Sequence, residues 1–289
     1  MNYRHAFHAG NFADVLKHAV LVRILLHLCA KPAPFRVLDT HAGAGRYDLA
    51  GAEASRGGEW RAGIGRLLAA ELAEDARALI APYLDAVCAL DPGERLASYP
   101  GSPALIGAFL RAQDRLLACE LEPAAAAALA RNLAGDRRAK ALAIDGWTAL
   151  NAYVPPKERR GLVLIDPSYE DAGDFSRLGQ ALVAAHRKWP TGGYLAWYPI
   201  KDRAGPDTLA RHLRRGGLAK ILRAELTVAR DPAGSTSHAA QPLAACGLIA
   251  INPPYTLADE LAIMLPALAA AMSDGPGGDH RLDLIAGEK

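Results

Sequence analysis

Residues 162–169 of the chain read Leu162-Val163-Leu164-Ile165-Asp166-Pro167-Ser168-Tyr169. A short apolar run bounded by turn residues is typical of a strand that is buried on both faces of a parallel sheet. Two earlier runs also end in an acidic residue, since residues 115–120 end at Glu120 and residues 139–145 end at Asp145. The pattern therefore predicts parallel strands whose carboxyl ends carry carboxylates.

The segments around these strands alternate between strand and helix patterns. Helical spacing of apolar residues predicts helices over residues 14–29, 123–133, 147–154, 175–188, 207–216 and 258–272. Further strands are predicted over residues 35–39, 193–199, 221–228 and 245–251. This alternation predicts an α/β fold with a central, mostly parallel sheet that is covered by helices on both faces.

We expect a single domain over residues 1–289 with one departure from regular alternation. Residues 50–100 are rich in alanine and leucine and predict a small helical insertion between the first and second strands. Ser102 is predicted to cap the next helix, with Pro103 in its first turn. Residues 274–289 follow a Gly/Pro-rich stretch, and we expect them to be a flexible tail.

Composition excludes several function classes and leaves nucleic-acid binding open. The net charge of the 289 residues is +2, with basic residues concentrated in 131–140, 157–160 and 201–223. These runs predict either a phosphate-facing surface or solvated helix faces. The four cysteines form no Cys-x-x-Cys pair, so we expect no metal site. The absence of a signal peptide or a long apolar run predicts a cytoplasmic protein without a membrane span.

The loop after the first strand predicts a nucleotide-like ligand. It reads Asp39-Thr40-His41-Ala42-Gly43-Ala44-Gly45, and its small residues, Gly43 among them, let a ligand approach the backbone. The third glycine of a dinucleotide fingerprint is replaced by Asp48, which favours a ligand without a pyrophosphate, such as S-adenosylmethionine. Glu120 suits a ribose diol and Asp145 an adenine amine. The alternatives are a solvated strand end for Glu120 and a turn-forming aspartate for Asp145.

Asp166, the carbonyl of Pro167 and Tyr169 form a pattern suited to chemistry on an exocyclic amine. Such an amine is a poor nucleophile because its lone pair is delocalised into the ring. Two acceptors held against its N–H groups orient it for attack, and an aromatic ring can stack on the base. The alternative is an ordinary Asp-Pro turn followed by a surface tyrosine.

A second stretch, Asn252-Pro253-Pro254-Tyr255, matches the amino-methyltransferase pattern better in isolation. The catalytic loop should directly follow the strand after Asp145, and that place belongs to Asp166. Strand order therefore favours Asp166 as the site and predicts that Asn252 begins a structural turn.

Three stretches of the chain resemble a known family. The first is residues 3–18, which read Tyr-Arg-His-Ala-Phe-His-Ala-Gly-Asn-Phe-Ala-Asp-Val-Leu-Lys-His. The others are residues 38–47 and 99–103. Together they are similar to the RlmJ-type 23S ribosomal RNA adenine-N6 methyltransferases, and the resemblance covers nearly the whole chain. It implies a Rossmann-like class I methyltransferase fold, a role in ribosomal RNA processing and ribosome biogenesis, and S-adenosylmethionine as methyl donor.

The resemblance also implies particular site residues. Contacts with the methyl donor would come from Lys17, His18, His41, Ser102, Glu120, Asp145, Gly146 and Asp166. Contacts with the target adenine in the RNA would come from Tyr3, with its neighbours Arg4 and His5, and from Tyr169. The family's catalytic motif has a second proline where this chain has Ser168, which alters the stiffness of the loop but keeps the acceptor atoms.

The expected reaction is direct methyl transfer from S-adenosylmethionine to adenine N6 of 23S ribosomal RNA by a monomeric, metal-free enzyme. The same tetrapeptide chemistry also serves DNA adenine or a protein glutamine amide, and both stay open as alternatives. A nicotinamide-dependent dehydrogenase is disfavoured by the missing glycine. An RNA-binding module without catalysis is disfavoured by the retained acidic residues.

Overall fold

The computed structural model describes residues 5–90, 96–171, 173–229, 243–273, 275 and 278–287. A central sheet of eight strands has the order β10-β8-β9-β7-β6-β1-β4-β5. Its strands are β1 (Arg36–Asp39), β4 (Arg115–Glu120), β5 (Ala139–Ala143), β6 (Gly161–Ile165), β7 (Gly193–Pro199), β8 (Ile221–Thr227), β9 (Ala245–Ile251) and β10 (Asp279–Ala286). The pairs β1·β4, β1·β6, β4·β5 and β6·β7 are parallel, while β9 is antiparallel to both β7 and β8. The prediction of a mostly parallel α/β sheet is confirmed.

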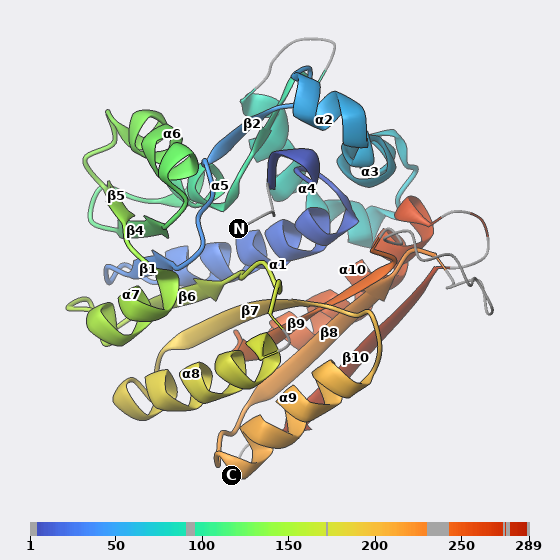
Figure 1. The fold of residues 1–289 in the computed structure, drawn as a ribbon. Helices are drawn as coiled ribbons and strands as arrows, with labels where there is room; N and C mark the ends of the chain where they lie inside the picture. The colour runs from blue at the N-terminus through green and yellow to red at the C-terminus, as the bar shows by residue number, and fades with distance from the viewer. Residues whose placement is uncertain are drawn as a thin grey trace.

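Helices cover both faces of this sheet, as Figure 1 shows, with α7, α8 and α9 on one face and α1 and α10 on the other. The covering helices are α1 (Phe12–Cys29), α5 (Ser102–Phe109), α6 (Pro123–Leu133), α7 (Gly146–Tyr153), α8 (Asp174–Lys188), α9 (Ala204–Arg215) and α10 (Leu257–Met272). Successive residues of β6 face opposite layers, since Leu162 and Leu164 pack in the core beneath α1 while Val163 and Ile165 pack beneath α8. This two-sided burial is why the strand reads as a continuous apolar run.

Helix α1 is buried along most of its length because it lies between the sheet and a group of short helices. These are α2 (Ala52–Gly57), the π-helical turn η2 (Arg61–Gly65), α3 (Arg66–Ala69) and α4 (Glu74–Ala89). In the sequence they lie between β2 (Arg46–Asp48) and β3 (Ser98–Pro100). These two strands pair antiparallel in a small separate sheet. The backbone at Gly63 comes so close to Gly10 that a Cβ there would lie 2.2 Å from the Gly10 carbonyl oxygen. Close approach of η2 therefore fixes the start of α1 against the short helices.

The start of α1 is capped by a side chain of the N-terminal stretch. Asn11 Oδ1 accepts hydrogen bonds from the backbone N–H groups of Ala13 and Asp14, both at 3.0 Å. A short 3-10 turn, η1 (His5–Phe7), precedes it. The cap holds Asp14, Lys17 and His18 of the first turns in place, and all three are buried.

The expectation of a flexible tail is wrong for residues 279–286. They form β10, an edge strand that pairs antiparallel with β8 over Asp279–Ala286. Arg223 of β8 donates two hydrogen bonds of 2.8 Å to the carboxylate of Asp283 on β10. The strand was missed because its local sequence is polar and follows glycines and a proline, whereas its pairing depends on a residue 60 positions away.

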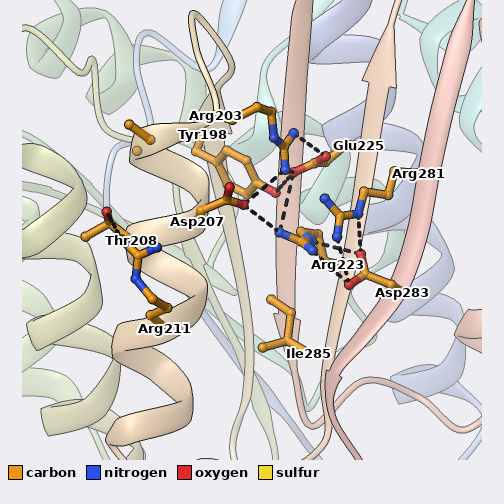
Figure 2. A network of polar contacts seen from close by, with 12 residues as sticks. Tyr198, Arg203, Asp207, Thr208, Arg211, Arg223, Glu225, Arg281, Asp283 and Ile285 are labelled. Carbon is orange, nitrogen blue, oxygen red and sulfur yellow. Dashed lines mark hydrogen bonds and ion pairs between the residues drawn. The ribbon is translucent and has the colours of Figure 1, made fainter.

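Figure 2 shows Arg223 between acidic partners on both sides. On the side away from Asp283, Glu225 accepts from the Tyr198 hydroxyl at 2.8 Å and from Arg203 at 2.7 Å. Only 3% of Arg223 and 4% of Glu225 is exposed. Both side chains therefore depend on these partners to stay charged inside the fold.

Replacing Asp283 with asparagine is expected to lower the free energy of unfolding by about 2 kcal/mol, because it weakens two charge-assisted bonds to buried Arg223. Urea denaturation monitored by circular dichroism measures the loss. Asp279→Asn at the exposed start of β10 is the matched control, and we expect it to change stability by less than about 0.5 kcal/mol. Equal effects of the two substitutions would show that the Arg223 pairing does not hold the strand.

Candidate active site

A cavity of about 440 Å³ lies at the carboxyl ends of β1, β4 and β6. This is the edge where the order of a doubly wound sheet reverses, on either side of β1, and where such folds bind ligands. The volume falls in the usual range for small-molecule sites, about 300–1,000 Å³. Its walls come from the starts of α1, α5 and α6 and from the loops after the three strands.

The cavity brings together most of the residues predicted from the sequence. Those that line it are His5, Lys17, His18, His41, Gly43, Ser102, Glu120, Asp166 and Pro167. Asp145, Gly146 and Tyr169 are not among the lining residues. Tyr3 and Arg4 lie outside the described residues, so their predicted contact with the target base stays a prediction.

Glu120 at the end of β4 organises the loop after β1. One carboxylate oxygen accepts the backbone N–H of Gly43 at 2.9 Å, and the other accepts the N–H groups of Leu121 and Glu122 at 2.8 Å. Gly43 has a left-handed backbone (φ +61°), and a Cβ there would lie 2.1 Å from the Tyr47 hydroxyl oxygen. A glycine is therefore required, and the loop presents backbone rather than side chains to the cavity.

Ser102 has a different role from the predicted helix cap. Gly101 occupies the N-cap position of α5, and the Ser102 hydroxyl donates to Asp39 Oδ2 at 2.7 Å. Asp39 at the end of β1 is fully buried, and burial raises the pKa of its carboxyl to about 7. Its other oxygen, Oδ1, has no hydrogen-bond partner among the described residues. The end of β1 therefore keeps an unused buried acceptor close to the cavity.

His18 has a second buried polar atom that makes no hydrogen bond within the described residues. Its Nδ1 lies 2.8 Å from the Tyr99 hydroxyl, while Nε2 has no partner within the described part of the chain. Burial lowers the pKa of the imidazole to about 3, so the ring is neutral near pH 7. His18 lines the cavity, and a buried imidazole nitrogen without a partner among the described residues fits a polar ligand there.

Asp166 lies at the end of a chain of polar contacts that begins in the N-terminal stretch. His5 Nε2 lies 3.0 Å from Asp14 Oδ2, and Lys17 Nζ donates to Asp14 Oδ1 at 2.8 Å. The Lys17 ammonium also donates to Asp166 Oδ2. Burial opposes ionisation of both α1 residues, but their partners hold the pKa of Asp14 well below and that of Lys17 well above the ordinary values. Lys17 therefore stays a cation that positions the Asp166 carboxylate.

Asp14 is a site-supporting residue that sequence reasoning missed. It does not line the cavity and acts through Lys17, three positions later on the same helix face. The sequence could have indicated this role, because Asp14 and Lys17 are three residues apart and such a spacing places an acid and a base side by side on a helix.

Tyr169 does not face the cavity as the stacking hypothesis requires. Its hydroxyl donates to the Trp197 carbonyl oxygen at 2.8 Å, and its ring lies 5.0 Å from that of Phe175 and 5.7 Å from that of Trp197, measured between centroids. Its backbone is left-handed (φ +52°). In this arrangement Ser168, which does line the cavity, lies closer to the site than the tyrosine ring does.

Asp145 and Gly146 make structural contacts at the start of α7, and their predicted contact with the methyl donor stays a prediction. Asp145 Oδ2 accepts from both the backbone N–H and the hydroxyl of Thr148 at 2.8 Å, and so caps α7. A Cβ on Gly146 would lie 2.1 Å from the Thr40 carbonyl oxygen, so the start of α7 packs directly on the loop after β1. The pair therefore shapes the floor beside His41, whose ring meets Trp147 edge-on at 5.2 Å.

The competing motif Asn252–Tyr255 lies at the amino ends of the parallel strands, opposite the edge of the sheet that carries the cavity. It follows β9, which runs antiparallel to β7, so Ile251 pairs with Tyr194 at the beginning of β7. Asn252 Nδ2 donates to the carbonyl oxygens of Pro190 and Gly192, both at 2.8 Å. The motif is separated from Asp166 by the length of a strand, as strand order predicted.

Acidification is expected to destabilise the protein through His18. Because its pKa is about 3 when folded and near 6.5 when unfolded, the unfolded chain binds an extra proton between these values. The contribution of His18 to stability is therefore complete above pH 6.5 and is lost as the pH falls, by up to about 1.4 kcal/mol per unit. Urea denaturation at pH 6.5 and 5.0 measures the slope.

The His18→Gln variant should show a shallower loss of stability between these pH values than the unsubstituted protein. His280→Gln on exposed β10 is the control and should keep the full slope. Identical slopes in all three proteins would contradict a buried neutral His18.

Comparison with known proteins places this arrangement in a family context. Residues 32–285 match the family model described as Ribosomal RNA large subunit methyltransferase D, RlmJ. The chain is 38% identical over 290 residues to the Ribosomal RNA large subunit methyltransferase J of Haemophilus influenzae and 37% identical over 288 residues to that of Escherichia coli K12, with 100% of each chain covered. A crystal structure of a Legionella pneumophila protein matches with a TM-score of 0.85 and 34% identity, over 96% of this chain and 98% of that one.

Proposed function

Because the chain belongs to the ribosomal RNA large subunit methyltransferase J family and is therefore a methyltransferase, we propose that it methylates the exocyclic N6 of an adenine in 23S ribosomal RNA, with S-adenosylmethionine as donor. The observation that carries the proposal is that Asp166, Glu120 and His18 line the same cavity. Asp166, which can accept the N–H groups of an amine, thus lines the same cavity as Glu120 and His18, which suit a polar, nucleoside-sized ligand.

The residues present fit S-adenosylmethionine. Glu120 offers a carboxylate to ribose hydroxyls, the backbone at Gly43 allows close approach, and His18 Nε2 is a buried nitrogen that lacks a partner within the described residues. S-adenosylmethionine, when bound, supplies an activated methyl group on a positively charged sulfur. The carboxylates around the cavity favour such a cation electrostatically.

Asp166 and Pro167 would hold the target amine. The Asp166 carboxylate and the Pro167 carbonyl oxygen each accept one N–H, which fixes the direction of the nitrogen lone pair toward the donor side of the cavity. Lys17 keeps one Asp166 oxygen in place and leaves the other for the substrate. Tyr169 could stack on the base only after its ring leaves the contact with Trp197.

An assay with three acceptors tests the substrate class. Purified protein and labelled S-adenosylmethionine are mixed with 23S ribosomal RNA from cells that lack the gene, with unmodified duplex DNA, or with a glutamine-containing protein substrate. We expect label only in the RNA, as N6-methyladenine after nuclease digestion. Label in DNA or in glutamine would keep the amine chemistry and overturn the RNA assignment.

A further inference from the structure

The sheet edge opposite the active site carries an exposed aromatic ring among basic loops. Tyr255 is 87% exposed, in the turn that leads into α10. Its ring lies 5.7 Å from that of His27 at the end of α1, nearly perpendicular to it. One isolated exposed tyrosine needs no explanation, so its surroundings decide whether it has a role.

The loop that carries Tyr255 is held rigidly. Asn252 has a left-handed backbone, and its side-chain amide donates hydrogen bonds to the Pro190 and Gly192 carbonyls. Pro253 and Pro254 follow, and the Pro254 carbonyl accepts the first N–H of α10 at 3.0 Å. A ring presented on a rigid loop loses little conformational entropy when a partner stacks on it.

Hydrogen bonds join this loop to the other loops of the same edge. The Asn252 N–H donates to the Lys220 carbonyl at 3.0 Å, and Trp189 Nε1, next to Pro190, donates to the Arg159 carbonyl at 3.2 Å. The Arg160 guanidinium in turn donates to the carbonyl of Leu28 in the last turn of α1 and to that of Ala33 just after this helix. These contacts gather Lys31, Arg159, Arg160 and Lys220 near His27 and Tyr255, and we name the six residues the Tyr255 patch.

Cations predominate among the described charged residues of this edge, and the exposed acid near Tyr255 is Asp259 in the first turn of α10. The acidic residue in loop 155–160, Glu158, is bound by Arg36 at 2.8 Å, and Glu260 on nearby α10 is bound by Arg23 at 2.9 Å. Burial and the cations Lys31 and Arg160 hold the pKa of His27 below 6.5, so its ring is a neutral surface at pH 7. The loops at the catalytic edge carry the opposite charge, from Glu120, Glu122, Asp145, Asp166, Glu170 and Asp171.

We propose that the Tyr255 patch is a second RNA-binding surface, at which an unpaired base stacks on Tyr255 while Lys31, Arg159, Arg160 and Lys220 contact the flanking phosphates. Exposed aromatic rings among cations are the usual means of binding single-stranded RNA. The inference rests on the proposed RNA substrate. It goes beyond it by assigning a contact that is distant from the target adenine.

The distance between the two edges makes the contact depend on RNA length. Seven residues of β7 separate the edges by about 20 Å, comparable to the width of a nucleic-acid duplex. A short RNA held at Asp166 therefore cannot reach the patch, whereas a folded ribosomal RNA can touch both edges.

Binding of full-length 23S ribosomal RNA to patch variants tests the proposal. Tyr255→Ala is expected to weaken binding about tenfold through lost stacking, and Tyr255→Phe to retain it. The double variant Lys31→Glu/Arg159→Glu should lower the slope of log affinity against log salt concentration by about 1.5 or more. Arg211→Glu/Arg215→Glu on exposed positions of α9 is the charge-matched control and should bind like the unsubstituted protein. Thermal midpoints and S-adenosylmethionine binding confirm that each variant folds.

The outcomes separate this inference from the proposed function. If the unsubstituted protein methylates 23S ribosomal RNA while all patch variants bind it normally, the Tyr255 patch is not an RNA surface and the function stands. Equal losses in the patch and α9 variants would also overturn the inference, because they would report general charge. If the unsubstituted protein neither binds nor methylates the RNA, the proposed function fails first.

Discussion

Asp166→Ala is expected to reduce the rate of methyl transfer by about 10³-fold or more, the largest effect of any substitution in the site. The variant loses the acceptor that orients the amine, and Lys17 loses one of its two carboxylate partners. Binding of S-adenosylmethionine should only weaken, because Glu120, Gly43 and His18 are unchanged. Single-turnover transfer and calorimetric titration measure the two effects separately.

Two further variants calibrate that result. Asp171→Asn changes an exposed acid a few residues after the motif and should keep full activity. Ser168→Pro restores the usual family residue and should also stay active, since the acceptors belong to Asp166 and Pro167. Full activity of Asp166→Ala would remove the tetrapeptide from the mechanism.

Lys17→Met is expected to lower transfer by about 10²-fold and the free energy of unfolding by about 3 kcal/mol. The substitution leaves the buried carboxylate of Asp14 and the partly exposed carboxylate of Asp166 without the cation between them. Lys140→Met, on an exposed position of β5, is the matched control and should change neither quantity appreciably. Urea denaturation and single-turnover transfer provide the measurements.

A double-mutant cycle tests whether Lys17 acts together with Asp14. Adding Asp14→Asn to Lys17→Met removes the charge that the first change left unpaired, so the two losses of stability should sum to more than the loss in the double variant. Strictly additive losses would contradict a coupled pair and would assign Lys17 to Asp166 alone.

The sequence was sufficient to predict the elements that are apolar along their whole length. The runs before Glu120 and Asp166 form strands that are covered on both faces of the sheet. Their residues are therefore apolar almost throughout, which the local sequence shows directly. The strands β2 and β3 have three residues each, and β10 is an edge strand that begins with three polar residues. Their existence depends on partners distant in sequence, such as Arg223 for β10, which local patterns do not reveal.

The site shows the same division between local and distant information. Acidic strand ends predicted Glu120 and Asp166 in one cavity, and strand order correctly separated Asp166 from Asn252. The packing of Tyr169 against Trp197 and Phe175 was not predictable, because those rings come from β7 and α8. For Asp145 the sequence offered a turn-forming role as the alternative, and the cap that the side chain makes on α7 uses Thr148, only three residues later.

No helix in the described ranges is both long enough and apolar enough to cross a membrane. A comparison of ribosomal RNA adenines by mass spectrometry tests the proposed substrate most directly. Ribosomal RNA from cells with the gene, without it, and without it but carrying the Asp166→Ala form is digested and compared. We expect one N6-methyladenine in 23S ribosomal RNA that is present only with the unsubstituted gene. An identical set of modified adenines in all three samples would contradict it.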